Sequence, residues 1–91
     1  GEKTAIRIPG TNALRVVDGL NLETKILNEV KNVSSLPYTQ QLRDYAKYAQ
    51  ANGYTFQLWV PETLSLSKLS GPLKKAIEDG EIVLRTFKPG G

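Results

Sequence analysis

Apolar and polar side chains alternate in the first fifth of the chain, which is the pattern of a β-strand with one buried face. The alternation runs over 4–8 and again over 13–17, and the turn-forming run PGTN at 9–12 separates the two stretches. We therefore predict a hairpin or two consecutive strands, closed by the Asp-Gly turn signal at 18–19. Residues 20–24 are expected to form a short connection.

A third strand is predicted over 25–31. Because side chains alternate along a strand, we expect Ile26 and Val30 on its buried face, and Glu29 and Lys31 together on the other face. Packing gives no reason for a carboxylate and an ammonium group to stand side by side there. This pair is the first candidate for a functional role.

Beyond residue 37 the period lengthens to that of a helix. Apolar residues recur at i, i+3, i+4 and i+7, namely Leu42, Tyr45, Ala46 and Ala49. The predicted elements are a helix over 38–52, a strand over 54–60, a loop over 62–67, a helix over 69–79 and a strand over 81–87. Ser67 or Ser70 is expected to cap the start of the second helix. The order β-β-β-α-β-α-β predicts an α/β domain with a mixed β-sheet flanked by helices.

The strand over 54–60 carries apolar side chains on both faces. Phe56 and Leu58 share one face, and Trp59 points to the other. Two apolar faces are typical of a strand inside a sheet that has a layer packed on each side. We therefore expect Trp59 to be covered.

The chain has 91 residues, enough for one core, so we expect a single domain over 1–91 that is one module of a longer protein. It contains no Cys and no His. Disulfides, Ser-His-Asp and Cys-His nucleophiles, His general bases and His-ligated zinc are therefore excluded. Catalysis would have to use carboxylates, lysine, tyrosine and a hard metal ion that prefers oxygen ligands.

The charge of the chain is mildly basic. The formal net charge is +3 and the pI is about 9.3, which favours a polyanionic partner. The sequence shows no apolar run long enough to span a bilayer and no signal peptide. We therefore expect no membrane partner. We also expect no small-molecule cofactor.

Asp18 and the pair Glu29-x-Lys31 form the pattern D-x10-E-x-K. Two carboxylates can hold Mg²⁺ beside a scissile phosphate, where the ion polarises the phosphoryl oxygen and acidifies a water, and a lysine can steady the nucleophile or the developing charge. E-x-K also arises by chance in roughly one chain in three of this size, and Glu23 and Lys25 form a second copy. We prefer Glu29 because it lies inside an apolar strand; the alternative is a solvated strand face.

Two pairs at helical spacing follow this strand. Gln41 and Tyr45 share a helix face and could orient a lysine or a phosphate, although Tyr45 could equally be core and Gln41 a solvated residue. Arg43 and Lys47 form a basic pair that could bind backbone phosphates. Together with Lys31 they are expected to gather around the carboxylates, because the strand leads into the helix through a short loop.

These residues resemble the PD-(D/E)XK, or restriction-endonuclease-like, nucleases. Asp18, Glu29 and Lys31 match the motif of that superfamily, and Gln41 and Tyr45 match its Q-x-x-x-Y extension. Longer runs look like the restriction-endonuclease-fold toxin domains at the C-termini of bacterial polymorphic toxins, such as Rhs and contact-dependent inhibition proteins. These runs are RVVDGL at 15–20, EVKNV at 29–33, YTQQLRDY at 38–45 and LSGPL at 69–73.

The resemblance covers nearly the whole chain and implies a small restriction-endonuclease-like core. Two features depart from the pattern of the superfamily. Val17 stands where its motif has a proline, and the usual N-terminal helix of the fold is not evident before Thr4.

The resemblance also implies a metal-dependent nuclease, in the first place a DNase, that acts as an antibacterial toxin effector. Asp18, Glu29 and the Val30 carbonyl would bind Mg²⁺ or Mn²⁺, Lys31 would position or activate the water, and Gln41 would assist at the site. DNA is the expected substrate, RNA is a second option, and an immunity protein in the producing cell would block the site. The domain would be secreted or delivered into the cytoplasm of the target bacterium as part of a larger toxin.

Two other functions stay open on the sequence. One is a non-catalytic module on the same fold that binds nucleic acid or protein through the charged strand face. The other is a housekeeping nuclease of the repair or resolvase type, with the same chemistry and no toxicity.

Overall fold

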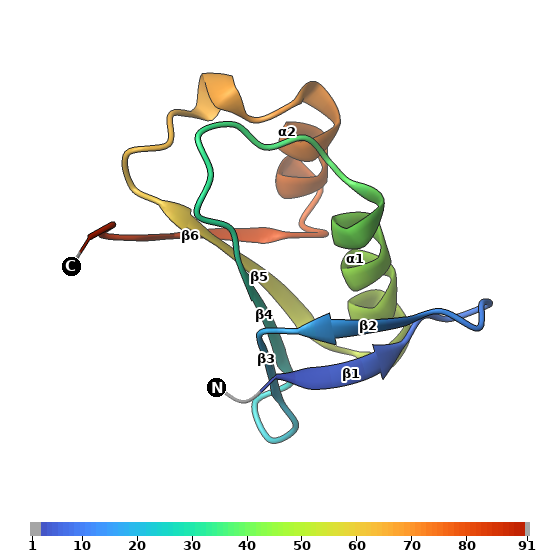
Figure 1. Cartoon of the computed structure of the whole chain (residues 1–91). Helices are drawn as coiled ribbons and strands as arrows, with labels where there is room; N and C mark the ends of the chain where they lie inside the picture. Colours follow the sequence, from blue (N-terminus) through green and yellow to red (C-terminus); the bar gives the residue numbers. More distant parts are fainter. Residues whose placement is uncertain (1–2, 91) are drawn as a thin grey trace.

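Two sheets of unequal size share one core in the computed structural model, which describes residues 3–90 (Figure 1). The smaller sheet is an antiparallel pair of β1 (Thr4–Arg7) and β2 (Leu14–Val17). The larger sheet has the order β3 (Gly19–Asn21), β4 (Ile26–Val30), β5 (Thr55–Pro61) and β6 (Val83–Phe87). Between the parallel strands lie α1 (Gln40–Asn52), the 3₁₀ turn η1 (Leu66–Lys68) and α2 (Gly71–Glu78). The predicted α/β class and mixed sheet are confirmed.

The prediction of a short connection over 20–24 is wrong, because the chain forms a further strand, β3, at Gly19–Asn21. This strand pairs antiparallel with β4. The carbonyl of Asn21 accepts a hydrogen bond from the Lys25 N–H at 2.9 Å and closes the turn between the two strands. A strand of three residues is too short to show alternation in the sequence.

Both helices cover the same face of the larger sheet (Figure 1). β4, β5 and β6 are parallel neighbours in chain order, so right-handed crossovers place α1 and α2 on one side. The core lies between this face and the helices. Its largest fully buried side chains include Leu27, Phe56, Leu58 and Val60 from the strands, and Leu42, Tyr45 and Leu73 from the helices.

The orientation of β4 is opposite to the predicted one. Leu27 and Glu29 are buried, whereas Val30 is 46% exposed. The expectation that Ile26 and Val30 form the buried face is therefore wrong. Alternation defines two faces without saying which of them is buried, and the core accepts Glu29 because polar partners meet its carboxylate there.

The other face of the sheet is open over β4 and β5. Trp59 and Gln57 are only partly buried on it, and both helices within residues 3–90 lie on the opposite side. The predicted second layer over Trp59 is therefore wrong for the described part of the chain. The indole N–H donates to Asn28 Oδ1 at 2.8 Å, so its polar atom is satisfied without a covering layer.

Local capping sets the helix boundaries. At the start of α1, Thr39 Oγ1 accepts from the Leu42 N–H at 3.2 Å, and at its end Gly53 adopts the left-handed φ of 73°. Ser70, one of the two predicted caps, begins α2 by accepting from the Leu73 N–H at 3.3 Å. Within residues 3–90 no helix is long and apolar enough to cross a membrane.

Candidate active site

Asp18 lies at the corner where the chain passes from β2 into β3. Its N–H donates to Glu29 Oε1 at 3.3 Å, and its Oδ2 accepts from the Val30 N–H at 2.9 Å. These two hydrogen bonds tie the corner to the end of β4. They place two carboxylates side by side at one edge of the sheet.

The register between β3 and β4 explains this meeting. Gly19 is paired with Asn28, so Asp18, one residue before Gly19, is carried to the position beside Glu29. Val17, fully buried, anchors the other side of the corner. Two residues separated by 11 positions in the sequence thereby become neighbours.

The carboxylates of Asp18 and Glu29 place two negative charges close together. Burial raises the pKa of Glu29, and the neighbouring Asp18 carboxylate raises it further, while the Asp18 N–H and the Lys31 ammonium act in the opposite direction. Glu29 is 5% exposed, and the Asp18 side chain is 34% exposed. Two carboxylates held together in partly buried surroundings repel each other, and a bound cation relieves that repulsion.

Lys31 reaches the same place from just beyond β4. Its backbone N–H donates to the Trp59 carbonyl at 2.9 Å, which prolongs the strand path by one residue. Its Nζ lies 3.5 Å from Glu29 Oε2 and donates to Gln41 Oε1 in the first turn of α1. The predicted placement of Glu29 beside Lys31 is confirmed, and Gln41 is a partner of the lysine rather than a solvated residue.

Tyr45 lies one helical turn after Gln41 and is fully buried. Its hydroxyl donates to the Val16 carbonyl at 2.9 Å, and its ring meets Phe56 edge to face at 5.9 Å between centroids. Burial, with the Glu29 charge as the next cause, raises the pKa of Tyr45 to about 12. Tyr45 is therefore a neutral hydroxyl that fixes α1 against β2, beside the carboxylates.

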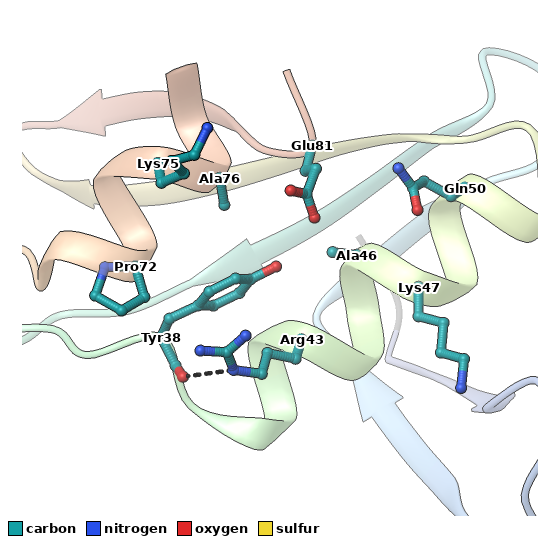
Figure 2. A pocket seen from close by; sticks show the side chains of 9 residues that line it. All are labelled: Tyr38, Arg43, Ala46, Lys47, Gln50, Pro72, Lys75, Ala76 and Glu81. Carbon is teal, nitrogen blue, oxygen red and sulfur yellow. Dashed lines mark hydrogen bonds between the residues drawn. The ribbon is translucent and has the colours of Figure 1, made fainter. Parts of the chain in front are cut away.

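Arg43 and Lys47 do not join this cluster, so the expectation that they gather around the carboxylates is wrong. Two residues along a helix turn the side chain by about 200°, which carries Arg43 away from the Gln41 side of α1. Both basic residues line a separate hollow of about 350 Å³ against α2 (Figure 2). There the Arg43 guanidinium lies over the Tyr38 ring, 4.2 Å from its centroid, and its Nε donates to the Tyr38 carbonyl at 3.2 Å.

Two ion pairs of the N-terminal part of the chain were not predicted. The Lys3 ammonium lies 4.0 Å from Asp18 Oδ1. Arg15 Nε donates to Asp44 Oδ2 at 3.1 Å and so ties β2 to α1. The sequence held a signal for the second pair in the long runs that carry the resemblance, since both residues lie in them; nothing in the sequence pointed to Lys3.

The arrangement offers three oxygen donors to a metal ion. They are the carboxylates of Asp18 and Glu29 and the carbonyl of Val30. The Val30 N–H points at Asp18, and the N–H and C=O of one residue in a strand project to the same side, so the carbonyl faces the same edge. Hard cations such as Mg²⁺ and Mn²⁺ take oxygen ligands of these kinds, so the donor set fits. Within residues 3–90 no three acidic, His or Cys side chains lie close enough together to hold a metal ion by themselves. Oxygen atoms of the substrate or of water would therefore complete the coordination shell of the metal.

The comparison with protein families identifies a family whose model covers most of the chain. The model of the family described as restriction endonuclease fold toxin 7 matches residues 1–73. This segment contains every candidate residue from Asp18 to Lys47. No curated protein and no solved structure matches the chain.

Proposed function

The chain belongs to the restriction endonuclease fold toxin 7 family, and from this membership we propose that it is a metal-dependent nuclease that hydrolyses phosphodiester bonds. We propose DNA as its substrate and an antibacterial toxin effector as its role. The domain would act in the cytoplasm of a target bacterium, delivered there as part of a larger toxin.

One observation carries the proposal: four polar groups that are separated in the sequence converge at the end of β4. Asp18 comes from the β2–β3 corner, Glu29 from β4, Lys31 from just beyond β4, and Gln41 from α1. An acidic pair with one lysine aimed at it is unusual inside a small core, where a buried charge is a burden on stability. Phosphodiester hydrolysis gives each member of the cluster a task.

The two carboxylates and the Val30 carbonyl would hold Mg²⁺ or Mn²⁺. The ion would polarise the phosphoryl oxygen and lower the pKa of a water beside it. Asp18, the more exposed carboxylate, faces the solvent from which substrate and ion arrive. Glu29 is held in one place by the Asp18 N–H and the Lys31 ammonium, so its oxygen atoms are already oriented.

Lys31 would act on the reacting phosphate and the attacking water. Its ammonium is fixed between Glu29 and Gln41, and its side chain is 25% exposed, so it keeps access to the solvent side. A charged donor held in place stabilises the negative charge that develops on the phosphoryl oxygens. Gln41 would be a positioning residue, because it touches the lysine and leaves the chemistry to it.

The toxin role requires protection of the producing cell. We propose an immunity protein that presents carboxylates to Lys31 and to Lys3, whose ammonium lies beside Asp18, and so competes with nucleic acid. Its association rate should fall as salt rises, with the Debye length near 8 Å at physiological ionic strength. Arg43→Ala/Lys47→Ala should leave this rate nearly unchanged, since the pair lies away from the carboxylates. A rate independent of salt would instead mean that the inhibitor docks away from the charged cluster.

A cleavage assay tests the nuclease directly. Plasmid DNA and a structured RNA of similar length are incubated with the domain in Mg²⁺, in Mn²⁺ and in excess EDTA. We expect cleavage of DNA with either ion and none with EDTA. Cleavage of RNA alone would replace the DNase by an RNase. Binding without cleavage under all conditions would favour the non-catalytic module.

Growth on induction separates a toxin from a housekeeping nuclease. The domain is expressed in the bacterial cytoplasm with and without the gene that neighbours its own. Growth arrest that the neighbouring gene relieves is the result expected of a toxin with its immunity protein. Normal growth together with active cleavage in vitro would favour a repair or resolvase enzyme.

A further inference from the structure

A groove crosses the open face of the larger sheet beside the carboxylates. Its volume is about 570 Å³, within the range of about 300–1,000 Å³ that small-molecule sites occupy. Asp18 and Val30 line it where β4 ends, and Asn28, Gln57 and Trp59 line its floor. The groove therefore starts at Asp18 and Val30, two of the three proposed metal donors, and continues over β5.

The register of the parallel strands arranges three residues in one row across this face. Val30 on β4 is paired with Trp59 on β5, and Trp59 is paired with Arg85 on β6. Paired residues of neighbouring parallel strands project to the same face, and the strands are about 4.8 Å apart. The backbone of Trp59 therefore lies about 5 Å from that of Val30, and the backbone of Arg85 lies about 10 Å from that of Val30.

Trp59 is anchored through its indole N–H, so the face of its ring stays available to a ligand in the groove. The indole N–H donates to Asn28 Oδ1 at 2.8 Å, which fixes the ring on the floor of the groove and satisfies its polar atom. The side chain is partly buried and lines the groove. An indole surface anchored beside amide side chains suits a flat aromatic ligand that also presents hydrogen-bonding groups at its edge.

We propose that Trp59 is a stacking platform for one unpaired base of the substrate, with the scissile phosphate at Asp18 and a more distant phosphate of the same strand at Arg85. This inference rests on the proposed nuclease function and names its substrate class: single-stranded nucleic acid, or a strand locally opened at the site. Within a duplex a base is covered on both sides by its neighbours, so it cannot lie on the indole. Asn28 and Gln57 stand at the floor of the groove to bind the edge of the base.

The charges along the row fit a nucleotide strand. Arg85 is exposed on β6 and carries no ion pair among the described residues, so it is available to a phosphate. Asp18, at the other end, is the place where a cation would screen the approaching phosphate. Between them Trp59 offers an uncharged surface. This alternation of charge, aromatic surface and charge is the arrangement by which proteins bind single strands.

The experiment uses binding in EDTA, where we expect no cleavage. Trp59 is the only tryptophan of the chain, so its fluorescence reports this groove alone. We expect a single-stranded oligonucleotide to quench it and a blunt duplex of the same sequence to quench it much less. Equal quenching by both, or no quenching by the single strand at concentrations where a labelled strand is bound, would overturn the proposal.

Substitutions measured by the anisotropy of a labelled single strand complete the test. Trp59→Ala should weaken binding by roughly 5- to 150-fold, and Trp59→Tyr, which keeps an aromatic ring, by much less. Arg85→Ala should lower the salt dependence of binding by about 0.7 in the log–log slope, as loss of one phosphate contact does on a single strand. Lys74→Ala is the matched control, because Lys74 is an exposed cation on the helix side of the sheet. It should change neither the affinity for the single strand nor the quenching of Trp59. Unchanged affinity in a folded Trp59→Ala variant would overturn the proposal.

The two proposals fail in different ways. Cleavage with no stacking signal would leave the nuclease standing and remove Trp59 from substrate binding. Stacking with no cleavage under any metal condition would remove the nuclease and leave a single-strand binding surface.

Discussion

Replacing Glu29 by glutamine should stabilise the metal-free protein while it removes the proposed activity. The carboxylate is almost fully buried beside Asp18, with its Oε1 3.3 Å from the Asp18 N–H. Burial and the Asp18 charge raise its pKa above the ordinary value, so ionised Glu29 is less favourable in the folded state than in water. At neutral pH the folded protein bears this penalty in full. Glutamine keeps the shape and removes the charge.

The attraction between Glu29 and Lys31 opposes this effect. At 3.5 Å and an effective dielectric constant of about 20, it amounts to about 5 kcal/mol before desolvation. The upward direction of the Glu29 pKa shows that desolvation and Asp18 together outweigh it. We therefore expect Glu29→Gln to raise the free energy of unfolding by about 0.5–2 kcal/mol, as relief of strain at a functional site commonly does.

Thermal and urea unfolding in EDTA measure this change. For a domain of this size each kcal/mol corresponds to about 4–8 °C in Tm. The matched control is Glu23→Gln, an exposed glutamate in the other E-x-K of the chain, which should shift Tm by less than about 2 °C. A loss of more than about 1 kcal/mol in Glu29→Gln would refute the reasoning and make Glu29 a structural partner of Lys31.

Substitutions at three further residues test other parts of the structure, two of them beside the carboxylates and one at the start of α2. Gln41→Ala should reduce cleavage by roughly 10- to 100-fold and shift its pH profile, because Lys31 loses an acceptor, whereas Gln41→Glu should restore most of the rate; an unchanged pH profile would make Gln41 merely structural. Tyr45→Phe should lower the free energy of unfolding by about 1–2 kcal/mol, since the Val16 carbonyl loses its donor. Because the folded-state pKa of Tyr45 is about 12, the wild type should also lose about 1.4 kcal/mol per pH unit above pH 10, where the unfolded state releases the proton first, and Tyr45→Phe should lack this loss. Ser70→Ala should lower the urea midpoint by the equivalent of about 1 kcal/mol, because α2 loses its cap, and Ser67→Ala should not.

The sequence predicted the elements of the second half well because their signals are local. The helical period from Leu42 to Ala49 and the cap at Ser70 act within one or two turns. A pattern of that kind needs no knowledge of the rest of the chain. The first helix nevertheless begins at Gln40, after a Thr39 cap that was not predicted, and not at residue 38. The three-residue strand β3 had no such local signal, since it is defined by its pairing with β4.

The cluster of Asp18, Glu29 and Lys31 was predicted from its spacing and its resemblance, and the structure brings these residues together. The orientation of β4 was predicted wrongly. Apolar content argued for Val30 inside, whereas Glu29 is inside because Asp18 and Lys31 meet its carboxylate there. Whether a polar residue is buried depends on partners that arrive from other elements, and hydrophobicity along one strand does not contain this information.

The misplacement of Arg43 and Lys47 has a similar cause. A short loop between strand and helix shows that the helix starts near the site, but not which of its faces turns toward the site. The buried stripe at Leu42, Tyr45 and Ala49 sets that rotation and leaves Gln41 at the border of the site. The open groove around Trp59 was missed because an apolar strand face was taken for a covered one.

Cleavage by Glu29→Gln and by Glu23→Gln, compared side by side in Mg²⁺, tests the central claim most directly. Both variants exchange one glutamate of an E-x-K triplet for its amide. Only Glu29 lies beside Asp18 and beside Lys31, the lysine that donates to Gln41. We expect Glu29→Gln to lose at least roughly 100-fold in rate while folded, since it removes a metal ligand, and Glu23→Gln to cleave like the wild type. Equal rates in the two variants would contradict the account.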